Sequence, residues 1–165
     1  MNRTEHTAFG WRIDRYEFDT GETYVVDVTE TTPKDNLTNR TFYVRGRITG
    51  ASSNPAFTVL PREAGFFHSE LQDNVLAGSL TFTVEEKAEW WCVNWALNNR
   101  KLPALEKFVL PAGQEVELPP GTKLYICRGT ASVYGRANGP TSELAAATPM
   151  VVGAVDDVYG LKFLE

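Results

Sequence analysis

The chain has 165 residues, of which 42% are hydrophobic and 12% aromatic, and its formal net charge is −5. A chain of this length and composition can bury the core of one domain and is too hydrophobic to stay disordered. Its 16 Lys and Arg residues form no run, which argues against a surface that binds nucleic acid.

The first segment, MNRTEHTAFGWRIDRYEF, contains no apolar run of the kind found in signal peptides. No stretch approaches the roughly 18 apolar residues that would span a membrane. We therefore expect no contact with a membrane and a location in the cytoplasm or in a virion. We also expect a single domain over residues 1–165, in which residues 1–20 form an N-terminal arm or an edge strand.

Strand signals follow one another from there to the end of the chain. Glu22–Thr31 is rich in β-branched residues, and Phe42–Ile48 alternates between apolar and polar side chains. Further short segments are bounded by Gly, Pro or polar turns, and no segment has the period of an amphipathic helix. About ten such strands predict an all-β fold, an antiparallel double-sheet jelly roll or barrel. The later strand segments are Phe57–Leu60, Leu80–Val84, Trp90–Trp95, four short units from Glu106 to Gly135, Met150–Val155 and Tyr159–Leu164.

The segment Phe108–Gly135, FVLPAGQEVELPPGTKLYICRGTASVYG, resembles half of a cupin barrel. Gly113 precedes Pro119 and Gly121 with the spacing of the family's second motif, and Gly129 stands where a family glycine closes a barrel strand. Tight turns at a barrel rim favour Gly for a positive φ and Pro for a fixed φ. The resemblance extends more loosely over residues 65–165 and implies a cupin-like barrel there.

The same resemblance implies that the metal site of the family is missing. The second motif would place a histidine at Leu124 and an asparagine at Arg128, and the first motif would place two histidines at Pro119 and Gly121. The chain has only 2 histidines, so we expect no bound metal and no cofactor.

The histidines allow one other metal hypothesis. On a strand His68 and Glu70 would face the same side, and with His6 they would make a set of two histidines and a carboxylate. We favour instead an ordinary loop histidine beside a surface glutamate. No catalytic serine, P-loop or dinucleotide-binding motif is present. Cys92 and Cys127 lie in apolar runs, typical of buried cysteines, and their spacing leaves a disulfide bond open.

Two groups of side chains are candidate contact residues. In an extended strand Trp91 and Trp95 share one face and Trp90 takes the other, so we expect one tryptophan to face outward while the rest pack in the core. Outward aromatic rings would stack on a sugar or on a partner. Arg45 and Arg47 share a face with Tyr43, which is either an interface or a solvated sheet face.

Three functions fit these observations. The first is a non-enzymatic jelly-roll module for protein assembly or binding, such as a phage or viral accessory or structural protein. The second is a cupin that binds a small, sugar-like molecule, and the third is a metal-independent isomerase or lyase that uses Tyr, Glu or His68 as an acid or base. We favour the first and expect a homo-oligomer, most simply a two-fold dimer.

Overall fold

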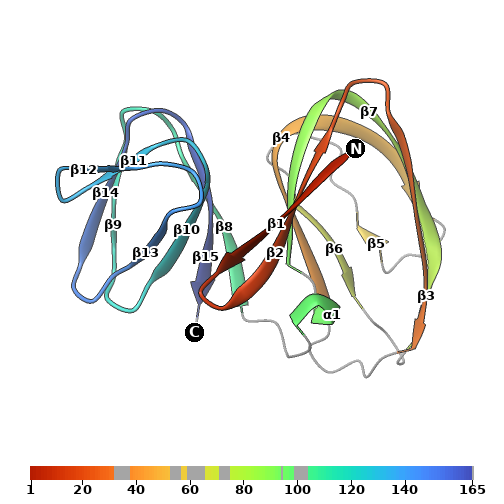
Figure 1. The fold of residues 1–165 in the computed structure, drawn as a ribbon, viewed down its shortest axis with the longest axis horizontal. Helices are drawn as coiled ribbons and strands as arrows, with labels where there is room; N and C mark the ends of the chain where they lie inside the picture. Colours follow the sequence, from red (N-terminus) through yellow and green to blue (C-terminus); the bar gives the residue numbers. More distant parts are fainter. Residues whose placement is uncertain are drawn as a thin grey trace. The chain divides into compact units, whose positions relative to one another are not determined.

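A computed structural model of the chain describes residues 1–31, 38–52, 57–58, 66–70, 75–93, 95–98 and 104–164. Its contacts divide the chain into two compact units. The N-terminal unit comprises Met1–Thr7 and Trp11–Leu102, and the C-terminal unit comprises Ala8–Gly10 and Pro103–Glu165. Each unit is built from strands (Figure 1).

The N-terminal unit contains a curved sheet of seven strands with the order β1-β2-β7-β4-β6-β5, in which β3 also pairs with β7. β7, which spans 19 residues, is the longest described strand of this sheet. The first part of β7 pairs with β3 and its last part pairs with β2, while β4 accompanies it on the other side. The elements are β1 (Asn2–Ala8), β2 (Trp11–Phe18), β3 (Thr23–Thr31), β4 (Thr38–Ser52), β5 (Phe57–Thr58), β6 (Phe66–Glu70), β7 (Val75–Val93) and α1 (Trp95–Asn98).

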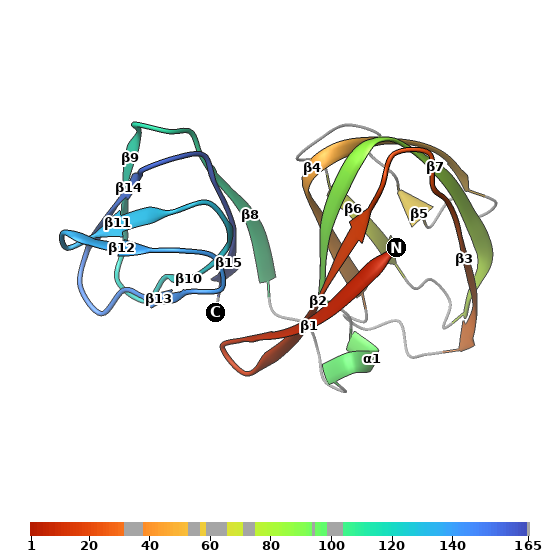
Figure 2. The same ribbon diagram turned by 45° about the horizontal axis from the view of Figure 1, so that its top comes forward.

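The C-terminal unit is a double-sheet jelly roll with antiparallel pairing throughout, as the sequence predicted (Figure 2). One four-stranded sheet has the order β13-β10-β15-β8 and the other has the order β12-β11-β14-β9. Apart from the hairpin of β11 and β12, strands adjacent in the chain therefore alternate between sheets. The elements are β8 (Ala104–Leu110), β9 (Glu115–Leu118), β10 (Lys123–Arg128), β11 (Ala131–Val133), β12 (Arg136–Asn138), β13 (Glu143–Ala145), β14 (Met150–Ala154) and β15 (Val158–Leu164).

The space between the two sheets of the jelly roll is filled with apolar side chains. Most of its strands contribute residues to one cluster there, because alternate positions of each strand point inward. Leu124, Ile126 and Val152 in this cluster have no exposed surface. The cluster consists of Phe108, Leu110, Leu118, Leu124, Ile126, Ala131, Val133, Ala146, Met150, Val152, Ala154 and Val158.

The predicted turns of the barrel rim are confirmed. Gly113, Gly121 and Gly129 all have positive φ values, of 82°, 87° and 92°. At Gly129 a second constraint applies, because a Cβ atom there would lie 2.2 Å from the backbone oxygen of Asp157. Gly129 is thus required both by its backbone conformation and by the close approach of a neighbouring turn.

We expect Gly129→Ala to lower the free energy of unfolding by about 2–4 kcal/mol, from the positive φ and the forced shift of the Asp157 backbone together. Gly121→Ala is the matched control, since its φ is also positive but no atom lies within 4 Å of a Cβ built there. That control should cost about 1 kcal/mol. Urea titrations of both variants measure the difference, and equal costs would contradict the steric argument.

The structure differs from the sequence expectations within Trp90–Trp95. Trp90–Trp95 is not one strand, because β7 ends at Val93 and Trp95 begins the four-residue helix α1. The double-sheet jelly roll described above begins at β8, and the single domain predicted over residues 1–165, with its cupin-like part over residues 65–165, stays a prediction. Composition does not mark the boundary between the units because both are built from strands of similar residue types.

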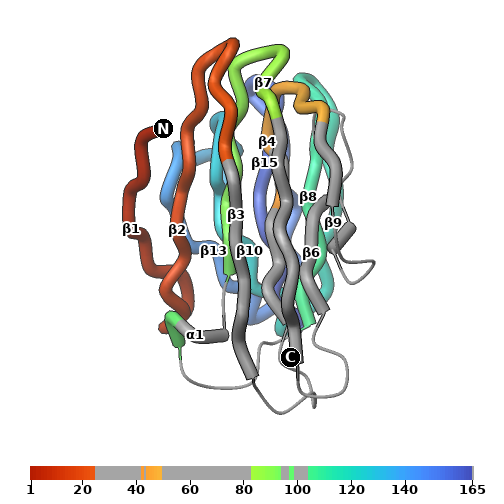
Figure 3. The backbone as a smooth tube through the Cα atoms, turned by 90° about the vertical axis from the view of Figure 1, so that its right-hand side faces the viewer, coloured from red at the N-terminus to blue at the C-terminus, as the bar shows by residue number. Residues whose placement is uncertain are grey.

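The first 20 residues contribute two strands to the N-terminal unit. β1 stands at one end of the strand order, beside β2 (Figure 3). β2 in turn pairs with β7, from Ile13 opposite Val93 to Phe18 opposite Ala88. The alternation predicted for Phe42–Ile48 is also observed, because its apolar side chains are buried and Arg45 and Arg47 are partly or fully exposed.

Candidate functional site

The predicted contact residues lie on three strands and a helix of the N-terminal unit. Trp90 and Trp91 are on β7. Tyr43, Arg45 and Arg47 are on β4, His68 and Glu70 are on β6, and Trp95 begins α1. The side chains of Tyr43, His68, Glu70 and Trp95 lie outside the described part of the structure, so the hypotheses that rest on them stay predictions.

Trp90 and Trp91 are both buried, with 5% and 1% of their surface exposed, so neither is the outward-facing tryptophan that the sequence predicted. They occupy opposite faces of β7, as the pairing with Tyr16 and Arg15 shows. Trp90 packs against Phe18, with ring centroids 4.8 Å apart. The sequence could not reveal that both faces of β7 are covered at this point.

Trp91 is covered by polar neighbours on its own face. The ring of His6 lies 4.7 Å from it, and the guanidinium carbon of Arg15 lies 5.9 Å from its centroid. Burial and the nearby Arg15 lower the pKa of His6. In the described structure the ring of His6 thus packs on Trp91.

The fully buried Glu89 is the centre of an ion-pair cluster. Its Oε1 lies 2.9 Å from Arg15 Nε and accepts a hydrogen bond of 3.2 Å from Trp91 Nε1, while its Oε2 lies 3.6 Å from Arg45 Nε. A buried carboxylate is tolerated only when it is paired and hydrogen-bonded. Arg45 therefore serves the fold at this position, which weakens the case for it as a contact residue.

Arg47 is exposed but is also paired. Its Nε lies 2.7 Å from Glu85 Oε2, and its Nη2 lies 3.3 Å from Glu86 Oε1. Exposed pairs of this kind are weak and leave the side chain accessible. Arg47 remains available to a partner, but the two glutamates outweigh its single positive charge.

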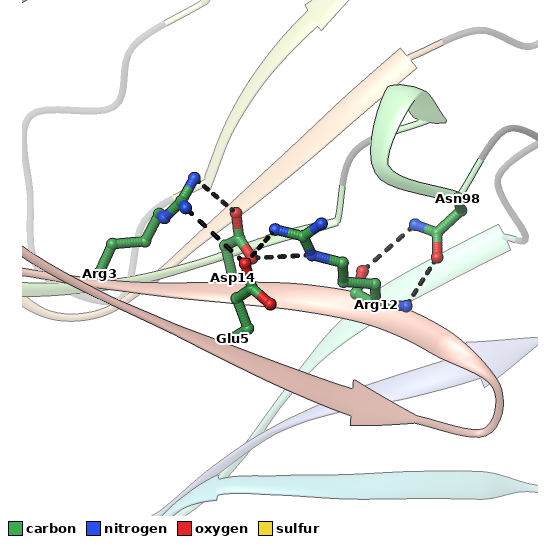
Figure 4. A network of polar contacts seen from close by, with 5 residues as sticks. All are labelled: Arg3, Glu5, Arg12, Asp14 and Asn98. Carbon is green, nitrogen blue, oxygen red and sulfur yellow. Dashed lines mark hydrogen bonds and ion pairs between the residues drawn. The ribbon is translucent and has the colours of Figure 1, made fainter.

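A second polar network joins β1, β2 and α1 (Figure 4). Asp14 has only 1% of its side chain exposed and lies between Arg3, at 3.7 Å, and Arg12, at 3.5 Å. Arg12 also pairs with Glu5 at 2.6 Å, and the side chain of Asn98 exchanges two hydrogen bonds with the Arg12 backbone. The two arginines and the two carboxylates of this network sum to no net charge. We therefore assign the network to holding β1, β2 and α1 together, since it offers no surplus charge to a ligand.

Tyr16 lies beside Cys92 and Asp14 on the same face of the sheet. Burial, reinforced by these two groups, raises the pKa of Tyr16 to about 12. The phenol therefore stays protonated at neutral pH and cannot serve as a base there. Neither Cys92 nor Cys127 forms a disulfide bond.

The positions at which the cupin motifs would hold a metal do not fit one. Leu124 is fully buried in the apolar core of the jelly roll, and the other motif positions are Pro119, Gly121 and Arg128. Among the residues that the structure describes, no three His, Cys, Asp or Glu side chains gather closely enough to hold a metal ion.

The C-terminal unit has one feature that sequence reasoning missed. A pocket of about 460 Å³ opens where the edge strands β12 and β13 of the two sheets face each other. Its lining includes Tyr134, Arg136, Asn138 and Glu143, with Val133 and Met150 from the core. The tight turn of Tyr134 and Gly135 places Arg136 opposite Val133, so a two-residue hairpin between an apolar and a polar strand is the signal that could have revealed it.

Comparison with solved structures places the fold among cupin-domain proteins. YhhW from Escherichia coli aligns with a TM-score of 0.54 and 10% identity, over 92% of this chain and 79% of that one. AerE from Microcystis aeruginosa aligns with a TM-score of 0.52 and 10% identity, over 99% of this chain and 92% of that one. At this identity the likeness concerns the fold alone, and it confirms a cupin-like fold.

A further structure, the bacterial pirin YhhW from Escherichia coli in complex with nickel(II), aligns with a TM-score of 0.52 and 8% identity, over 92% of this chain and 80% of that one. No protein-family model matches the chain, and no curated protein matches it. In the described residues, no helix has the length and apolar character needed to cross a membrane.

Proposed function

We propose that this chain is a non-enzymatic cupin-like module that acts in protein assembly, by association of its own copies. The observation that carries the proposal is the filled interior of the jelly roll. Where barrel chemistry needs polar side chains and room for a substrate, this unit has buried Leu124, Ile126 and Val152. Because the centre of this interior is filled, we look for the contact that serves assembly on the outer surface of the jelly roll.

The outer face of the β12-β11-β14-β9 sheet supplies a suitable surface. Val151 on β14 is 50% exposed, between the buried Met150 and Val152, and Val155 just beyond the strand is 63% exposed. The register places small residues beside Val151 on this face, with Gly153 opposite Ser132 and Ser132 opposite Ala137. On the other side of β14, Val151 lies opposite Glu117 and Gly153 opposite Glu115, so the result is a narrow strip of small and apolar residues bordered by two carboxylates.

A second copy of the chain is the occupant that this face fits best. Flat sheet faces with small side chains stack closely, and closed two-fold symmetry is the commonest form of self-association. The acidic side chains of this face, Glu115 and Glu117, lie on the edge strand β9. A two-fold arrangement that turns the two β9 strands away from each other keeps these like charges apart.

We expect the wild-type protein to have the mass of a dimer in light scattering at micromolar concentration. Val151→Lys should raise the dimer dissociation constant by at least about tenfold, because a charge would replace an apolar contact in both copies. Val109→Lys is the matched control, since Val109 is 42% exposed on β8 in the other sheet. A wild-type monomer mass at high concentration, or an equal effect of both variants, would contradict the proposal.

A further inference from the structure

The edge strand β12 departs from the apolar pattern of the jelly-roll interior. Arg136 pairs with Val133, and Asn138 pairs with Ala131, so both polar residues stand on the face of the sheet that carries the core. Residues directly opposite each other on paired strands project to the same side. Arg136 is nevertheless exposed and Asn138 is half-buried, so these polar side chains lie at the open edge of the apolar interior.

These two side chains enter a pocket with an apolar floor. Val133 and Met150, which are 5% and 2% exposed, belong both to the core and to the pocket lining. The volume of about 460 Å³ lies within the range of small-molecule sites. None of its lining residues occupies a cupin metal-motif position, so this site is separate from the one that the motifs would build.

Two of the polar groups around the floor, Asn138 and Glu143, are held by hydrogen bonds and still keep capacity to bind. Asn138 Nδ2 donates to the carbonyl oxygens of Arg136, at 3.1 Å, and Ala131, at 3.4 Å, which leaves Oδ1 as an acceptor. Glu143 accepts a hydrogen bond of 2.6 Å from the Phe9 backbone N–H through Oε1 alone. Arg136 forms no ion pair with any residue in the described part of the chain.

An aromatic ring completes the site at its rim. Tyr134 is 72% exposed and belongs to the pocket lining. Its φ of 51° lies in the left-handed region, where glycine, asparagine or aspartate is the usual residue of such a hairpin turn. The chain therefore keeps a large exposed ring at a position where a small residue would be easier to accommodate.

We propose that this pocket binds a neutral, hydroxylated ring molecule of the size of a simple sugar. The apolar floor and the Tyr134 ring suit the apolar face of such a ring. Arg136 offers donors, Glu143 and Asn138 offer acceptors, and hydroxyl groups are both. One cation and one anion give the pocket no net charge and hence no general attraction for an anionic ligand. This site is independent of the self-association proposed above.

Two other roles for Arg136 predict different experimental results: binding of an anion, and protection of the edge strand against pairing with another chain. As a planar cation it is suited to an anion such as phosphate. An inward-facing charge on an edge strand can also serve only to prevent pairing with another chain. The experiment therefore includes inorganic phosphate as a probe and a measurement of aggregation.

The test is a titration, by ligand-observed NMR and calorimetry, with glucose, galactose, mannose, N-acetylglucosamine, maltose and lactose, and separately with inorganic phosphate. We expect at least one sugar to bind with a dissociation constant of about 1 mM or lower, which is roughly −4 kcal/mol. Arg136→Ala and Tyr134→Gly should each weaken binding about tenfold or more. Tyr134→Gly removes the ring and relieves the positive φ, so its effect cannot come from misfolding.

Arg47→Ala is the matched control, because Arg47 is an exposed arginine of the N-terminal unit and should leave sugar binding unchanged. No binding of any of these sugars at about 10 mM would overturn the proposal, as that excludes affinities in the usual millimolar range. Sugar binding that both pocket variants leave unchanged would overturn it too. Phosphate binding lost in Arg136→Ala without sugar binding would assign the pocket to anions, and aggregation of Arg136→Ala without any binding would assign the arginine to edge protection.

Discussion

Replacing Trp90 or Trp91 with alanine is expected to lower the free energy of unfolding by about 3–5 kcal/mol in each case, as for other buried aromatic residues. Both side chains are at least 95% buried, although they occupy opposite faces of β7. Trp90 would leave a cavity beside Phe18, and Trp91 would leave one beneath His6 and Arg15.

Urea titration followed by far-ultraviolet circular dichroism measures this loss without depending on tryptophan fluorescence. Tyr134→Ala is a suitable control, because that aromatic ring is exposed and its loss should change stability by less than about 1 kcal/mol. A cost below about 1 kcal/mol for either tryptophan would mean that its side chain faces solvent, contrary to the structure.

Replacing Glu89 with glutamine is expected to cost about 2–4 kcal/mol of the free energy of unfolding. Removing one member of a fully buried ion pair leaves its partner as an uncompensated buried charge. The loss in the free energy of unfolding is then typically about 3–5 kcal/mol. The range expected here is lower because Arg15 and Arg45 have side chains that are 29% and 33% exposed and can be partly hydrated.

Glu85→Gln is the matched control, because Glu85 pairs with Arg47 on an exposed part of the sheet, where a pair contributes about 0–1 kcal/mol. Urea titrations at low and high salt separate the two cases, since salt screens exposed charges far more than buried ones. Equal and small losses in both variants would show that Glu89 is not the anchor of a buried cluster.

Local features of the sequence were enough to predict much of the fold. The turns at Gly113, Gly121 and Gly129 follow from residues a few positions apart, and their positive φ values match that expectation. The alternation in Phe42–Ile48 likewise places its apolar side chains inside, because a strand has a period of two whatever it packs against.

The partners of each strand depend on the tertiary structure. Glu89 is an ordinary glutamate in the sequence, and only the pairing of β7 with both β2 and β4 brings Arg15 and Arg45 to it. The same pairing covers both faces of β7, so Trp90 and Trp91 are both buried, and β7 ends before Trp95.

For the candidate ligand site too, one part follows from the local sequence and the other part depends on the tertiary structure. The two-residue turn at Tyr134 and Gly135 fixes the register that places Arg136 opposite Val133, and this much is local. That β12 faces β13, and that Glu143 lies across the pocket, depends on the closure of two sheets whose edge strands do not pair. A single sequence carries the pattern of each strand, whereas the packing of one sheet on the other determines which side chains meet.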